Sequence, residues 1–161
     1  MIALCTAWLG WEHSWRVGFL PRSLRISRIL YANERIFGLG PGGNEAGIIV
    51  YALSSNAAAA ALRGGVSYLE GRPGQGRSLY RDWKATPMKA PVRVFGRVLG
   101  STDICDVICA GPEAAGVHAD PQIIRQVNQS LAQRGSYYSS GPNGLLVVSP
   151  ASRRAVFAYA K

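Results

Sequence analysis

The stretch that decides the fold lies near the carboxyl end and reads Leu145-Leu-Val-Val-Ser-Pro-Ala-Ser-Arg-Arg-Ala-Val-Phe-Ala-Tyr159. Two apolar runs, 145–148 and 155–159, flank a polar turn that contains Pro150. Runs of this kind on either side of a short turn are typical of an antiparallel hairpin. The core-facing residues of the second strand are either Val156, Ala158 and Ala160 or Phe157 and Tyr159. The end of the chain therefore predicts two neighbouring strands of an antiparallel sheet.

Further strands and a helix are predicted upstream of this hairpin. Residues 24–31 begin with alternating apolar and polar side chains, which indicates a half-buried strand, and the β-branched run 47–53 indicates a central strand. Ser54 or Ser55 caps a helix that is expected to run to Arg63 and to stop at the glycine pair 64–65. Short strands are predicted over 66–69 and 92–99, within a middle section whose pattern is otherwise weak.

A second helix is predicted from the chemistry of its first turn. Asp120 is a typical N-cap residue. Pro121 fits the first helical position, because a backbone N–H there would have no partner within the helix and proline has none. The apolar stripe of this helix consists of Ile123, Ile124, Val127 and Leu131, and Gly135 is expected to end it. Hairpins combined with two or three helices, without a strand–helix–strand rhythm, predict an α+β fold in which an antiparallel sheet packs against the helices.

The chain is strongly basic, with 18 Lys and Arg against 9 Asp and Glu and a formal net charge of +9. Segment 72–97 has a net charge of +6, because its seven cations face one acid, Asp82: Arg72, Arg77, Arg81, Lys84, Lys89, Arg93 and Arg97. Residues 98–120 then contain four acids and no Lys or Arg. Either the basic segment binds an anionic partner, or it pairs with the acids that follow it. Arg outnumbers Lys 15 to 3, which GC-rich coding sequences often produce. The base composition of the gene is therefore an alternative explanation of the positive charge.

The neighbours of these cations bear on the kind of anionic partner. Tyr80, Trp83 and Phe95 lie among them, and aromatic rings beside cations can stack on bases while the cations contact phosphates. The alternative is an irregular surface segment that is anchored by its aromatic side chains. The possible partners are an anionic protein, a membrane surface or a nucleic acid. No helix-turn-helix, zinc-finger or RNP signature is present, so no sequence motif supports the nucleic acid.

The glycine-rich stretch Gly38-Leu-Gly-Pro-Gly-Gly43 formally matches the G-x-G-x-x-G pattern. A dinucleotide site needs a helix directly after the glycines, whereas a β-branched strand follows here, so no cofactor is predicted. A structural hairpin loop is expected. As a candidate anion site, the loop would use the backbone N–H groups of Gly38, Gly40, Gly42, Gly43 and Asn44. A similar pattern at 138–144 indicates either a duplicated half-domain or two loops of similar chemistry.

Catalytic and metal-binding signals are sparse. No G-x-S-x-G or H-E-x-x-H motif occurs, and the only histidines are His13 and His118. An enzyme would use His118 or Cys109 together with the glycine loop, which keeps a small hydrolase or transferase as the alternative function. Cys5, Cys105 and Cys109 give an odd count, so they predict no disulfide framework, and their spacing to the histidines predicts no metal site.

The amino end is apolar and rich in tryptophan. Trp8, Trp11 and Trp15 recur at helical spacing, which fits either a helix packed on the core or a membrane–water interface. Residues 1–11 lack the leading basic residues of a secretory signal and are too few to span a bilayer, unless they end a longer anchor. We expect residues 1–20 to form a separate segment and 21–161 a single α+β domain. The cell envelope is the expected location, with the cytoplasm as the alternative.

The leading hypothesis is a non-enzymatic domain that binds an anionic partner through residues 72–97. A continuous basic face would favour this binding domain. A deep pocket that joins the glycine loop to a residue of perturbed pKa would favour an enzyme. The sequence gives no signal for the oligomeric state.

Overall fold

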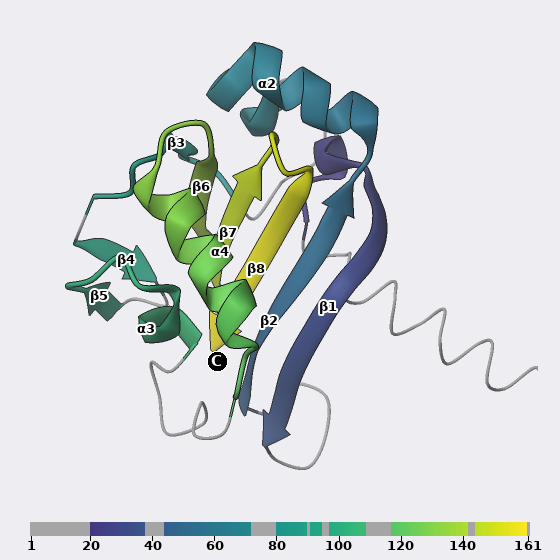
Figure 1. Ribbon diagram of the computed structural model, residues 1–161. Helices are drawn as coiled ribbons and strands as arrows, with labels where there is room; N and C mark the ends of the chain where they lie inside the picture. The colour runs from purple at the N-terminus through teal and green to yellow at the C-terminus, as the bar shows by residue number, and fades with distance from the viewer. Residues whose placement is uncertain are drawn as a thin grey trace, which may run out of the picture.

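The computed structural model describes residues 20–37, 44–71, 80–89, 91–94, 97–108, 117–141 and 144–160. At its centre is a six-stranded sheet in the order β1-β2-β8-β7-β6-β3, and every neighbouring pair is antiparallel (Figure 1). The strands are β1 (Ile26–Phe37), β2 (Asn44–Leu53), β3 (Lys84–Ala85), β6 (Tyr137–Gly141), β7 (Gly144–Ser149) and β8 (Arg154–Ala160). A separate hairpin pairs β4 (Val92–Val94) with β5 (Arg97–Leu99).

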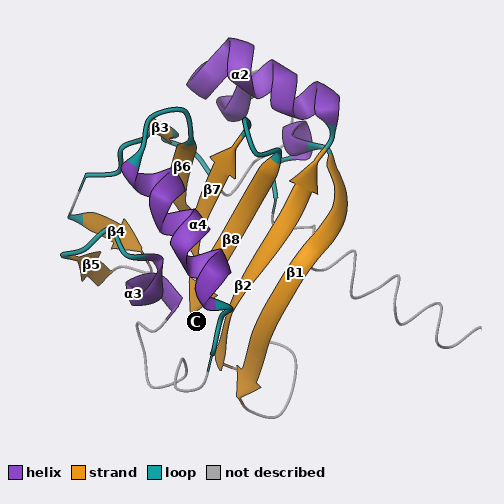
Figure 2. Ribbon diagram, in the orientation of Figure 1, coloured by secondary structure: helices purple, strands orange, loops and turns teal. Residues whose placement is uncertain are grey.

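The helices lie on the sheet and across one of its ends. They are the short 3-10 turn η1 (Arg22–Leu24), α2 (Ser55–Glu70), α3 (Ile104–Ile108) and α4 (Pro121–Ala132). Figure 2 shows α4 crossing one face of the sheet and α2 lying over the strand ends. Helix α3 packs against α4 and β8. The expected α+β class, an antiparallel sheet packed against helices, is confirmed.

The central strands are buried on both faces of the sheet. Ile48 and Val50 of β2 join one core cluster with α3 and α4, whereas Ile49 and Tyr51 join a second cluster on the other side, with α2. The same alternation divides β8, where both candidate sets are buried, one on each face: Val156, Ala158 and Ala160, and Phe157 and Tyr159. Burial on both faces explains why these strands read as continuous apolar runs.

Helix α2 corrects two predictions. A break does occur at Gly65, whose φ of 55° and ψ of −137° are not helical, but helical turns resume beyond it and end at Glu70. The predicted strand 66–69 is therefore wrong, because these residues continue the helix. Leu69 is buried in the cluster beside α2, with Val66 partly buried against it. Packing of this apolar face outweighs the tendency of a glycine pair to end a helix.

Helix α4 begins as predicted. The Asp120 carboxylate accepts a hydrogen bond from the Gln122 N–H at 2.7 Å, and Val127 and Leu131 are buried. The helix ends at Ala132, before the expected end at Gly135.

Two predicted strands differ in length or form from the observed ones. The predicted strand 24–31 continues to Phe37, and the segment 92–99 forms the β4–β5 hairpin instead of one strand. The two similar loops fall between the paired strands β1 and β2 and between β6 and β7, as two ordinary hairpins would.

Candidate functional site

Four cations of the basic segment are exposed along one side of the sheet. Arg81, Lys84, Lys89 and Arg93 are all exposed, and Lys84 belongs to the edge strand β3. Lys84 pairs with Tyr138 of β6, and β4, which contains Arg93, also lies against β6. Charged side chains on an edge strand prevent further strands from pairing with it. The side chain of Arg97 and all of Arg72 and Arg77 lie outside the described residues.

Two of the three aromatic residues of this segment, Tyr80 and Trp83, point into the protein, whereas Phe95 lies outside the described residues. Tyr80 is 1% exposed and Trp83 is 4% exposed, both in the core cluster beside α2. The Tyr80 ring meets Phe157 edge-to-face at 6.0 Å, and burial raises the pKa of Tyr80 well above its ordinary value. Neither ring is therefore available to stack on a base. The second interpretation is confirmed for these two rings: they anchor an irregular surface segment.

A hydrogen-bonded clasp fixes the segment to the end of α4. The Thr86 N–H donates to the Ser136 carbonyl at 2.9 Å, and the Met88 N–H donates to the Leu131 carbonyl at 2.7 Å. The buried Thr86 hydroxyl also donates to the Ser136 carbonyl at 3.0 Å and accepts from the Ser136 N–H at 3.1 Å. These bonds bring the residues between Lys84 and Lys89 beside the residues around Arg134.

Arg134 is therefore a fifth cation of this surface, and sequence reasoning missed it. The residue is exposed and lies two positions before Ser136, the partner of Thr86. No sequence signal connects it to the basic segment, because only the fold brings the two together. We call the five residues the cationic edge: Arg81, Lys84, Lys89, Arg93 and Arg134.

Asp103, the first acid that follows the basic segment, has partners other than the cations of that segment. The Asp103 carboxylate accepts hydrogen bonds from the Cys105 N–H at 2.9 Å and from the Asn128 side chain at 2.8 Å. These two hydrogen bonds lower the pKa of Asp103, so the carboxylate stays ionised. Among the described side chains, no ion pair joins the cationic edge to Asp103 or Asp106. Internal neutralisation of the basic segment is thus not found in the described part of the chain.

The residues of the enzymatic alternative are largely undescribed. Gly38, Gly40, Gly42, Gly43 and Cys109 lie outside the described residues, and Asn44 is the first residue of β2. His118 is exposed, and its carbonyl accepts a hydrogen bond from the Asn33 side chain at 3.0 Å. The pairing of the loop with His118 or Cys109 therefore stays a prediction.

The described ranges also bear on metal binding, on the state of Cys105 and on membrane insertion. No group of three His, Cys, Asp or Glu side chains there is arranged to hold a metal ion. Cys105, in α3, is half-buried and carries a thiol. None of the described helices combines the length and the apolar character needed to cross a membrane. The tryptophan-rich segment 1–19, on which the envelope prediction rests, lies outside the described residues.

The chain is thus an α+β domain whose antiparallel sheet has a cationic edge. No protein-family model, curated protein or solved structure matches the chain.

Proposed function

We propose that this protein is a non-enzymatic binding domain that docks a polyanionic partner on the cationic edge. The supporting observation is that five exposed cations from two distant parts of the chain gather beside β6, and that among the described side chains none of them forms an ion pair with Asp103 or Asp106. Cations that are not neutralised within the protein keep their attraction for a partner's charge, and clustering strengthens the local potential.

The partner is expected to present repeated negative charge on its surface. Tyr80 and Trp83 are buried, so neither ring can stack on a base, and a nucleic acid would be held mainly through contacts of the cations with its phosphates. An acidic protein surface or an anionic membrane offers the same type of contact through carboxylates or lipid phosphates. Binding through charge alone predicts a strong dependence on salt and little preference among sequences.

Two triple variants of equal net charge test the proposal. The first, Lys84→Gln with Lys89→Gln and Arg134→Gln, removes three charges of the cationic edge. The control, Arg22→Gln with Arg28→Gln and Arg63→Gln, removes three exposed charges elsewhere. Arg28 lies on β1, at the opposite edge of the sheet. Both sets of changes are expected to leave folding intact, because exposed charges contribute little stability.

Binding is measured by fluorescence anisotropy or co-sedimentation over a range of salt concentrations. The probes are labelled duplex DNA, a labelled poly-glutamate peptide, and vesicles with and without phosphatidylserine. At least one anionic probe should bind the wild type, and the edge variant should bind it more weakly than the control. If duplex DNA binds, the log–log salt slope of the edge variant should be flatter by about 2.7, at about 0.9 per lost phosphate contact. Equal weakening by both variants, or no binding of any probe, would overturn the proposal.

A further inference from the structure

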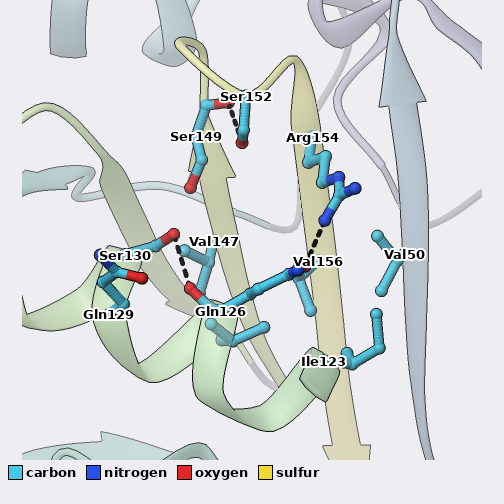
Figure 3. A pocket seen from close by; sticks show the side chains of 11 residues that line it. Val50, Ile123, Gln126, Gln129, Ser130, Val147, Ser149, Ser152, Arg154 and Val156 are labelled. Carbon is cyan, nitrogen blue, oxygen red and sulfur yellow. Dashed lines mark hydrogen bonds between the residues drawn. The ribbon is translucent and has the colours of Figure 1, made fainter. Parts of the chain in front are cut away.

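A cavity of about 300 Å³ lies between α4 and the sheet (Figure 3). Its floor is a row of valines from three adjacent strands, since Val156 of β8 pairs with Val50 of β2 and with Val147 of β7. Ile123 and Val127 of α4 form the facing wall. The pocket is open to solvent on the side where Gln129 and Ser152 are exposed, and its volume is at the lower end of the range for ligand pockets.

One end of the cavity is polar and carries a single charge. Arg154 starts β8 and lies on the same face as Val156, because strand residues two apart share a face. Its guanidinium donates to the Gln126 side-chain oxygen, so a hydrogen-bonded pair joins β8 to α4 beside the valine floor (Figure 3). Among the described residues that line the cavity, Arg154 is the only one with a charged side chain, and none of them carries a carboxylate.

The polar groups at this end mainly donate hydrogen bonds. The guanidinium has five N–H donors, of which one bonds Gln126, and that bond leaves the Gln126 amide NH₂ group as a second donor. The Ser149 hydroxyl oxygen accepts from the Ser136 hydroxyl at 3.0 Å, which leaves its own hydrogen to donate. An apolar floor beside several donors and one positive charge, with no carboxylate among the described lining residues, is complementary to an anion with an apolar body.

The geometry points to this cavity as a binding site for a small organic carboxylate, with the carboxylate on Arg154 and Gln126 and the apolar body on the valine floor. One water molecule takes up roughly 30 Å³ in the liquid, so the volume has room for about ten groups of that size. The site uses none of the residues of the cationic edge, so this inference stands or falls separately from the proposed function.

The test compares two probes of the same shape, 3-phenylpropanoate and the neutral 3-phenylpropanamide. Each is titrated into the full chain and followed by NMR at the methyl groups of Val50, Val147 and Val156. The wild type should bind the carboxylate about tenfold more tightly than the amide, because hydrogen bonds to charged groups are the stronger ones. The shifts should concentrate on the three valines.

Arg154→Gln removes the charge and keeps a polar side chain, and the matched control is Arg153→Gln at the adjacent exposed arginine, which does not line the cavity. The first variant should abolish the preference for the carboxylate, and the second should preserve it. Equal binding of both probes by the wild type, shifts away from the valines, or no binding overturns the inference. These wild-type results decide the matter even if Arg154→Gln fails to fold.

Discussion

Replacing Thr86 with Val tests whether the clasp between Thr86 and Ser136 holds the cationic edge in place. The Thr86 side chain is 5% exposed, and its hydroxyl makes two hydrogen bonds with the Ser136 backbone. Valine has nearly the same shape, so packing changes little, while both bonds are lost and the buried Ser136 N–H loses a partner. A lost hydrogen bond together with an unsatisfied buried donor costs about 2 kcal/mol in the free energy of unfolding.

The free energy of unfolding is measured by urea denaturation followed by circular dichroism. For a domain of this size, a loss of about 2 kcal/mol corresponds to a fall of about 4–8 °C in Tm. The matched control is Thr102→Val, which makes the same chemical change at a half-buried position. Its effect should stay within about 0.5 kcal/mol. If Thr86→Val is no more destabilising than Thr102→Val, the clasp does not hold the edge and the reasoning is refuted.

Two further predictions concern other parts of the fold. Gly144→Ala should destabilise the protein by about 3 kcal/mol or more, because Gly144 has a φ of 147° and a Cβ there would lie 2.3 Å from the Ala158 carbonyl oxygen. Gly100→Ala is its control, since a Cβ at Gly100 meets nothing within 4 Å, and similar urea midpoints for both variants would contradict the prediction. Hydrogen bonds from the Cys105 N–H and the Asn128 side chain lower the pKa of Asp103 in the folded state. This stabilisation is present above the unfolded pKa of about 4 and is lost as the pH falls through the folded pKa. Asp103→Ala should therefore lose less stability on acidification than the wild type, and identical urea midpoints against pH for both proteins would exclude this role.

Elements whose signals are local could be predicted from the amino-acid sequence alone. Asp120 starts α4 because its side chain accepts a hydrogen bond from the N–H of Gln122, only two residues away. Pro121 fits the first helical position because it has no backbone N–H, and an N–H at that position would have no partner within the helix. The hairpin of β7 and β8 follows from two apolar runs and the turn between them. The α+β class follows from such hairpin and helix patterns. Each pattern is contained in a short stretch of sequence and does not depend on distant parts of the chain.

Other features depend on contacts between residues that are far apart in the sequence, and these could not be predicted from local patterns. The helix resumes after Gly65 because Leu69 gains burial in the core, an energy that no local pattern contains. Likewise, β3 has only two residues, and its place in the sheet depends on pairing with β6 more than fifty residues later.

The cationic edge, too, could be predicted from the sequence only in part. The density of cations in 72–97 is visible in the sequence, but burial of Tyr80 and Trp83 and the addition of Arg134 are not. Charge is a property of the residue itself, whereas the direction of a ring and the neighbours of an arginine are set by packing. Thr86 and Ser136 are fifty positions apart, and the hydrogen bonds between them place Arg134 beside the basic segment.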